Sequence, residues 1–445
     1  MMMTFKNWLR EEGMRLRGYF SRQEGVALTT ALILLVVLSA LAFVSVRWTA
    51  QDIPRTKNFT KTRQAAYIAE AGFHRAVNYF NYDATGKSPG ELSNGFTDEI
   101  NGSNWPSGTF TNIAMGAGTY TVTIVDNSDD GDQTTDSDNA VILTSTGTVG
   151  GVEVKVEGTL VRALYQAQHA LATDGDLLVS GNPTITGSNG SVHSNSDLSL
   201  TGNPSVSSTA TASGTFTATG SPSVGGGTAS GATTEGIPVV NISDYKSTSQ
   251  YVLGADGIVR NGGGTFIHDT SVSGNFRTSG NANKGWGYSA GPPVVWDLGD
   301  DEAFEGTYYV EGSAEMSNSG SSAHPFDVTV IAEGHITVGG NATLRNKKLA
   351  SDPEEVQNIF LMAGTDIDLQ GNISNSVQGM IYAGEQIEIS GNPTINGFVL
   401  AADSAASDSE VTANKVNGNP TITYNGGSVS PFFSNKVTVT SWQEL

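Results

Sequence analysis

The acidic loop at residues 126–138 holds the residue types best suited to metal chemistry. Oxygen side chains occupy alternate positions ahead of a glycine, Gly131. That spacing is typical of the start of a calcium loop, where oxygen ligands converge on the ion and glycine permits a sharp turn. Repulsion among the carboxylates also favours a bound cation. The candidate calcium ligands are Asp126, Ser128, Asp130, Asp132, Asp136 and Asp138.

A solvated acidic loop between two strands is the alternative to a calcium site. An EF-hand would need a bidentate glutamate where Ser137 stands, and helices on both sides of the loop, which the flanking sequence does not predict. The sequence leaves both interpretations open.

Two carboxylate pairs, Asp366 with Asp368 and Glu385 with Glu388, could supply a general acid and base if they met on adjacent strands. The equivalent positions in related segments hold other residue types, and outward-facing acids are expected for solubility alone. The six histidines show no metal-ligand spacing, and no phosphate-binding glycine loop precedes a helix. We therefore expect no enzymatic activity.

Composition favours turn-rich β structure. The chain has 445 residues, 54 of them glycine, only 15% charged residues and no cysteine. Disulfides and thiolate metal sites are thereby excluded. The net charge of −21 argues against nucleic acid as a partner, because phosphate backbones attract clustered lysine and arginine.

Residues 26–46 form an uncharged apolar run, VALTTALILLVVLSALAFVSV. At ~1.5 Å per residue a helix of this length just spans a ~30 Å hydrocarbon core. Basic residues precede the run, so the positive-inside rule places the N-terminus in the cytoplasm and the rest of the chain across the membrane. A secretory signal peptide is the alternative, but the run exceeds the usual apolar length and ends without a clean cleavage site.

The residues before this run, Arg22-Gln23-Glu24-Gly25, followed by Val26-Ala27-Leu28, resemble the leader of type IV pilins. The resemblance implies cleavage after Gly25 by a prepilin peptidase, and methylation of the new N-terminus at Val26. Major pilins carry a glutamate at the position of Thr30, and that glutamate pairs with the terminal amine of a neighbouring subunit. The uncharged Thr30 cannot make this ion pair. The same gap occurs in PilX-like minor pilins and in the pseudopilin that caps type II secretion filaments, which implies a priming or tip-proximal position.

The resemblance to PilX-like minor pilins continues at residues 62–72, TRQAAYIAEAG, beyond a helix break that we expect at Pro54. Alanine and phenylalanine then recur at helical spacing, which predicts an apolar stripe against a sheet or against helices of neighbouring subunits. Glu70 is either a helix residue that is solvated or paired i,i+4 with His74, or an assembly contact. The stripe consists of Ala66, Ala69, Phe73, Ala76 and Phe80.

Period-two alternation at residues 119–125, 141–146 and 152–160 predicts three antiparallel strands packed on the long helix. The resemblance to pilins covers roughly residues 22–162. It implies an α+β pilin-like module with a long N-terminal transmembrane helix and an antiparallel sheet. The predicted boundaries are a leader at 1–25, a helix at 26–82 and a sheet domain at 83–165.

From residue 166 onward a unit of ~20 residues recurs, which is typical of a solenoid. In three aligned copies the apolar pairs Ile336/Val338, Ile367/Leu369 and Ile387/Ile389 occupy one face. We predict an all-β right-handed parallel β-helix over 166–445, with the motif Gly-Asn-Pro at its corners. Residues 205–234 would be thin coils or a flexible stretch, and 241–326 an insertion. The insertion's aromatics, Trp286, Tyr288, Trp296, Tyr308 and Tyr309, would form its own core or stack on sugars.

These patterns predict a minor pilin of a type IV pilus or related filament. It would sit in the inner membrane as a single-pass protein with its C-terminus outside the cytoplasm, and later at the pilus or cell surface. Implied partners are other major and minor pilins, prepilin peptidase, the inner-membrane assembly machinery and, through an adhesive β-helix, surface glycans. The alternative is a membrane-anchored extracytoplasmic β-helix protein that binds or degrades polysaccharides.

Overall fold

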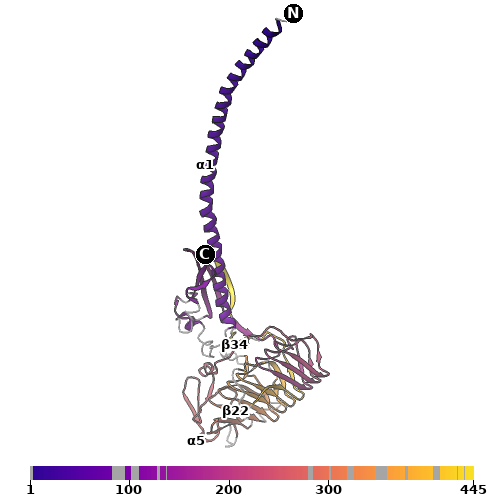
Figure 1. The fold of residues 1–445 in the computed structure, drawn as a ribbon. Helices are drawn as coiled ribbons and strands as arrows, with labels where there is room; N and C mark the ends of the chain where they lie inside the picture. The colour runs from indigo at the N-terminus through magenta and orange to yellow at the C-terminus, as the bar shows by residue number, and fades with distance from the viewer. Residues whose placement is uncertain are drawn as a thin grey trace.

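The computed structural model describes residues 4–82, 96–101, 110–127, 131–136, 138–278, 284–299, 302–317, 325–346, 358–375, 379–403, 411–427, 429–434 and 436–445, with the backbone alone before residue 26. A long helix leads into a small antiparallel sheet, and a larger stack of short strands follows (Figure 1).

Helix α1 (Thr4–Tyr82) is continuous over 79 residues and contains Pro54. The helix break expected at Pro54 is therefore wrong. Proline removes one backbone hydrogen bond, but residues 51–60 are all exposed, so the carbonyl left without a donor can bond to water. Figure 1 shows the helix as a gently curved rod that extends far beyond the β structure.

The first sheet packs against the C-terminal part of α1. It contains the three predicted strands, which are confirmed as β2 (Gly118–Asp126), β3 (Ala140–Val149) and β4 (Val152–Val161), all antiparallel. β1 (Ile113–Met115) pairs with β2, and the short helix α3 (Thr97–Ile100) precedes it. The outer strand on the other side is β35 (Thr438–Glu444), from the far end of the sequence, paired antiparallel with β4. The sequence had placed these residues in the β-helix domain.

Because β35 belongs to the first sheet, the stacked region lies between two adjacent strands of that sheet. The chain leaves β4 through β5 (Leu164–Gln166) and returns through β34 (Val429–Phe433), which pairs antiparallel with β5. Val437 reaches the core of the first sheet, and its backbone N–H donates to the Asn81 side chain of α1 at 2.7 Å. Both ends of the stacked region are thereby held at one place.

The stack consists of three ladders of parallel, in-register strands. One ladder runs, in spatial order, through β13 (Phe216–Gly220), β10 (Leu198–Gly202), β7 (Leu177–Gly181), β32 (Asn414–Val416), β30 (Ile387–Ile389), β27 (Ile367–Leu369), β24 (Ile336–Gly339), β22 (Ser313–Ser317) and β20 (Val295–Leu298).

The other two ladders follow the same order. The second contains β15 (Thr228–Ala229), β12 (Ala210–Ala212), β9 (Val192–Ser194), β6 (Leu171–Thr173), β31 (Thr394–Ala401), β29 (Gly379–Ala383), β26 (Ile359–Ala363), β23 (Phe326–Ala332), β21 (Gly306–Val310) and β16 (Tyr251–Leu253). The third contains β14 (Ser223–Val224), β11 (Ser205–Val206), β8 (Thr184–Thr186), β33 (Thr421–Thr423), β28 (Ser374–Asn375) and β25 (Thr343–Arg345), and it includes parts of β31 and β23.

The spatial order of the repeats is a circular permutation of their sequence order. The chain enters mid-stack at β6 and β7 and winds outward to β13. It then crosses back along the flank through residues 230–250, which include η1 (Ile242–Tyr245). From the opposite end it winds inward until β32 lies beside β7, with Asn414 opposite Leu177. Residues more than 230 positions apart therefore pair as if they were consecutive repeats.

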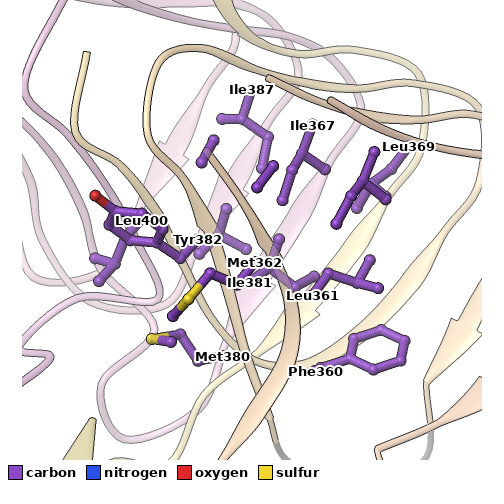
Figure 2. Packing of buried hydrophobic residues seen from close by; sticks show 14 of the residues in the cluster. Phe360, Leu361, Met362, Ile367, Leu369, Met380, Ile381, Tyr382, Ile387 and Leu400 are labelled. Atoms are coloured by element: carbon purple, nitrogen blue, oxygen red, sulfur yellow. The ribbon is translucent and has the colours of Figure 1, made fainter. Parts of the chain in front are cut away.

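The core of the stack confirms the predicted facing of the repeats. Ile367 and Leu369 pair with Ile387 and Ile389, and all four are buried. Figure 2 shows Ile367, Leu369 and Ile387 gathered in the interior above Leu361 and Ile381. β26 and β29 are buried on both faces. The crossing segment, residues 230–250, covers their outer face, where the Tyr382 hydroxyl donates to the Pro238 carbonyl and accepts from the Val240 N–H.

The insertion predicted at 241–326 differs from the structure, because strands from Val295 to Ser317 belong to the parallel ladders. Antiparallel hairpins occupy only the end of the stack, through β17 (Ile258–Arg260), β18 (Phe266–Asp269) and β19 (Trp286–Ser289), with the short helix α5 (Thr270–Ser273) after β18. Residues 205–229 form ladder strands, so this part of the chain is regular β structure and not the flexible stretch that the sequence left open.

Candidate assembly helix and acidic loop

Residues 26–46 of α1 are apolar and exposed. The part of α1 whose side chains are described, Val26–Asn81, contains an 18-residue window with a mean hydropathy of 2.7 that is 0% buried, long and apolar enough to cross a membrane. Side chains such as Leu28, Leu35 and Phe43 are more than 60% exposed. A shallow groove on this part of α1 is lined by Ala31, Leu34, Leu35, Leu38, Ser39 and Ala42. In water so much apolar surface is unfavourable, so this segment suits lipid or other helices.

Thr30 lies within this apolar segment and bonds to its own helix. Its hydroxyl donates to the Val26 carbonyl and lies 3.2 Å from the Ala27 carbonyl. These bonds satisfy the hydroxyl without a partner from outside the helix, as an apolar surrounding requires. Gly25 lies in the same uninterrupted helix, one residue before Val26.

The C-terminal part of α1 packs closely on the first sheet. Small residues permit the approach, because a Cβ on Gly147 of β3 would lie 2.1 Å from the Ala65 carbonyl oxygen. Phe73 is 1% exposed, and its ring fills the space over Gly158 of β4. The predicted stripe thus faces this chain's own sheet, and Phe73 is not available to a neighbouring subunit.

Glu70 lies at the rim of this helix–sheet contact and is half-buried. Among the described residues it forms no ion pair with His74, whose ring instead meets Phe73 edge-on at 6.1 Å. Two nearby cations of α1 contact the sheet. The Arg75 guanidinium donates to the Tyr120 hydroxyl at 2.6 Å, and the Lys61 ammonium donates to the Gly150 carbonyl at 3.1 Å.

The acidic loop brings three of its predicted ligands together. One carboxylate oxygen from each of Asp126, Asp136 and Asp138 lies within 4.8 Å of the others, with Asp126 buried, Asp136 half-buried and Asp138 exposed. Burial raises the pKa of Asp136, opposed by hydrogen bonds from backbone N–H groups, the shortest from Phe96 at 2.7 Å. Converging carboxylates suit a hard cation such as calcium.

Of the remaining candidate ligands, only Asp132 is described, and it does not join this group. Asp132 accepts hydrogen bonds from the side chains of Thr134 and Thr135, which lower its pKa to about 2. Ser128 and Asp130 lie outside the described residues. Calcium binding therefore stays a prediction, carried by three residues of the six.

Asp366 and Glu388, one member of each candidate carboxylate pair, make contacts within the stack. Asp366 is fully buried and accepts a hydrogen bond from the Gln386 backbone N–H at 2.8 Å, which joins successive repeats. Glu388 pairs with the Lys415 ammonium at 3.0 Å, and Asp368 lies beside Glu388 in the ladder. Burial is the main cause that raises the pKa of Asp368.

The aromatic residues of the predicted insertion lie mostly inside the stack. Trp286, Trp296, Tyr308 and Tyr309 are 0% exposed, whereas Tyr288 is half-buried. A sugar ring in solution cannot stack on the four buried rings. These four residues belong to the core of the stack, and not to the separate core that the sequence predicted for an insertion.

Sequence reasoning missed two polar arrangements in the stack. The first is a ladder of asparagine amides, in which each side chain donates to the next at 2.9–3.1 Å. The recurring Gly-Asn-Pro motif was its signal, but the order of its members depends on the stacking. The ladder runs Asn203, Asn182, Asn419, Asn392, Asn372 and Asn341.

The second arrangement joins the crossing segment to the stack. Glu235 accepts a hydrogen bond from the Tyr165 hydroxyl at 2.8 Å and lies 3.4 Å from His169 Nε2. The His169 ring stacks on that of His193 with centroids 5.1 Å apart. No sequence pattern indicated this contact, because its members come from three segments that are distant in sequence.

No protein-family model matches the sequence, and no curated protein sequence matches it. Among solved structures, the chain is similar to the competence-associated pilin ComZ from Thermus thermophilus, at 13% identity and a TM-score of 0.29. That similarity covers 87% of this chain and 98% of the other. Because this structural similarity is weak, the proposals below rest on the geometry of α1 and its sheet and not on the similarity to that pilin.

Proposed function

We propose that this protein is a minor pilin of a type IV pilus or related filament. It inserts in the inner membrane through residues 26–46, is trimmed after Gly25 and then enters or primes a filament through α1. The supporting observation is the division of α1 into two parts. Residues 26–46 expose an apolar surface, and the C-terminal part of the helix packs on an antiparallel sheet.

The exposed apolar part of α1 requires a cover that the rest of the chain does not supply among the described residues. Burying apolar surface stabilises by about 25 cal/mol per Å². Lipid supplies that cover before assembly, and helices of neighbouring subunits supply it in a filament. Processing after Gly25 would leave this helix in the membrane and create a new N-terminus at Val26.

Thr30 supports a priming or tip-proximal position over the repeating shaft. Its hydroxyl bonds to its own helix and carries no charge to pair with the terminal amine of a neighbour. A subunit without that ion pair makes a weaker contact with the next subunit, which suits an end position or an initiating one.

The stacked region is the part that this pilin would display. We assign its three ladders to the coils of a right-handed parallel β-helix, a fold that in-register parallel pairing of short repeats supports. Its insertion between β4 and β35 would hold it to the pilin module at both ends. We propose adhesion, with a surface glycan as the candidate partner, as its role.

The second candidate function is a membrane-anchored protein that binds or degrades polysaccharides and never enters a filament. The stacked parallel ladders favour it, because polysaccharide-active proteins often have parallel β-helices. Burial of Trp286, Trp296, Tyr308 and Tyr309 counts against it, since those rings offer no platform for sugars. The ion pair of Glu388 with Lys415 counts against an acid–base pair there.

The deciding experiment compares Gly25→Leu with the matched control Gly18→Leu, which changes a glycine of the same predicted leader. In the wild type and the control we expect an intact mass that begins at Val26, and recovery of the protein with sheared pili. Gly25→Leu should retain residues 1–25 and be absent from the pili. Wild-type protein found only in membranes with residues 1–25 intact would instead support the second candidate.

A further inference from the structure

All three ladders of the stack end at one repeat, residues 216–229. β13, β14 and β15 each have a paired strand on one side and, among the described residues, none on the other. These strands form the free right-hand end of the stack in Figure 1, away from α1. A terminal strand of this kind presents N–H and C=O groups that no further strand pairs, and it is a template for pairing with another chain. One of them, the Phe216 N–H, donates to the Ser230 hydroxyl at 2.8 Å, and this side-chain contact would be exchanged on strand pairing.

The core is open at this end. Phe216 and Ala218 occupy the inward positions of β13, opposite Leu198 and Leu200 of the repeat below. Leu198 and Leu200 are 0% exposed, whereas Phe216 is half-buried and Ala218 is exposed. The terminal repeat thus presents the inner face of the core to solvent, where a further strand would cover it.

No charged side chain in the local sequence repels another copy of the same edge. Residues 198–234 contain no Asp, Glu, Lys or Arg. Charged side chains are a common means of protecting edge strands from association, and this edge lacks them. At the opposite end, antiparallel hairpins follow the last ladder strands and carry charged groups, such as the Arg260–Asp256 ion pair at 2.6 Å.

We propose that this end binds a second copy of this chain through antiparallel pairing of β13 with β13 of the copy. A two-fold axis at the middle residue of the five-residue strand makes the contact self-complementary. Ala218 then faces Ala218 of the copy, Phe216 faces Gly220, and Thr217 faces Thr219. The pairing continues the ladder across the interface, and each open core covers the other.

Cysteine cross-linking tests the register, since the chain has no native cysteine. Facing Cα atoms of an antiparallel pair lie about 4.5–5.5 Å apart, within the range of a disulfide. We expect Ala218→Cys in the full chain, purified in detergent, to form a covalent dimer under mild oxidation. Thr201→Cys, an exposed residue of the repeat below, should stay largely monomeric. Equal cross-linking of the two variants would overturn the proposal.

A charge test addresses the affinity without touching the core. The double change Thr217→Lys and Thr219→Lys alters two exposed side chains and places like charges opposite each other across the axis. We expect it to weaken dimerisation by about tenfold or more in sedimentation velocity of the detergent-solubilised chain. An unchanged dimer with the wild-type melting temperature would contradict the proposed contact. A wild-type chain that is monomeric at micromolar concentration would also overturn it, leaving this edge to a strand of another protein.

Discussion

At the scale of single residues, close backbone contact between repeats decides which side chains the corners accept. Gly391 has a φ of +83°, and a Cβ there would lie 2.7 Å from the Gly371 carbonyl oxygen of the neighbouring repeat. Gly151 in the turn between β3 and β4 has the same φ of +83° but no heavy atom within 4 Å of such a Cβ. The two glycines share a backbone requirement and differ in the space around them.

We expect Gly391→Ala to lower the free energy of unfolding more than Gly151→Ala does. Both variants lose about 1–2 kcal/mol of unfolding free energy because alanine disfavours the left-handed backbone conformation. Gly391→Ala loses about 1–3 kcal/mol more because its Cβ overlaps the neighbouring repeat. Chemical denaturation of the two variants measures the difference. Equal losses would show that the repeats can move apart at this corner without cost.

The acidic loop yields a second prediction at this scale. If Asp126, Asp136 and Asp138 hold calcium, the ion stabilises the fold by about 2.7 kcal/mol at a concentration 100 times its dissociation constant. Calcium should then raise the melting temperature over that in EDTA, and Asp126→Asn should abolish the rise. Asp132→Asn is the control that should keep it, since Asp132 bonds to Thr134 and Thr135. The solvated-loop alternative predicts no effect of calcium on any variant.

At the scale of elements, the crossing segment is held to the stack partly by a titratable contact. Burial is the main cause that lowers the pKa of His169, the His193 ring lowers it further, and the Glu235 carboxylate opposes both. The neutral form of His169 therefore dominates in the folded state over a wider range of pH than in the unfolded chain. Its contribution to stability is present above the unfolded pKa of about 6.5 and is lost as the pH falls through the lower folded pKa.

We therefore expect the melting temperature to fall on acidification from pH 7.5 to 5.5, and to fall less in His169→Gln. Glutamine can keep a hydrogen bond to the Ser191 hydroxyl, which lies 2.8 Å from His169 Nδ1, but it does not titrate. Calorimetry at several pH values checks this. The same pH dependence in both proteins would show that other titratable groups control it, and not Asp174, whose pKa burial raises and whose protonation on acidification would stabilise the fold.

At the scale of the whole molecule, the permuted stack joins the beginning and the end of the inserted region. Asn182 donates to Asn419 at 3.0 Å within the asparagine ladder, although 237 positions separate them. Closing so long a loop is entropically unfavourable, so contacts between the first and the last repeat must offset that entropy. The neighbouring strands β5 and β34 add to it from the side of the first sheet.

A double-mutant cycle of Asn182→Ala and Asn419→Ala should give a coupling energy of about 0.5–1 kcal/mol. Asn182 with Asn341, which lies at the far end of the same ladder, is the control pair and should give a coupling near zero. Equal coupling in both pairs would mean that the alanines act through a general loss of stability, and the permuted order would lose this support.

The sequence by itself determined the elements whose signals are local. A continuous apolar run identifies the membrane-competent part of α1, and period-two alternation identifies β2, β3 and β4. The recurring apolar pairs also determine which face of each repeat is buried, because side chains alternate strictly along a strand. These signals depend only on neighbours a few positions away.

Tertiary structure alone decided the order of the repeats, the return of β35 to the first sheet and the grouping of the Asp126, Asp136 and Asp138 carboxylates. Each repeat offers nearly the same edge, so many stacking orders satisfy the periodic pattern equally well. The choice among them depends on contacts between distant segments, such as Tyr382 with the crossing segment and Val437 with the core beneath α1. The burial of Phe73 against its own sheet follows for the same reason, since an apolar helical stripe does not specify which surface will cover it.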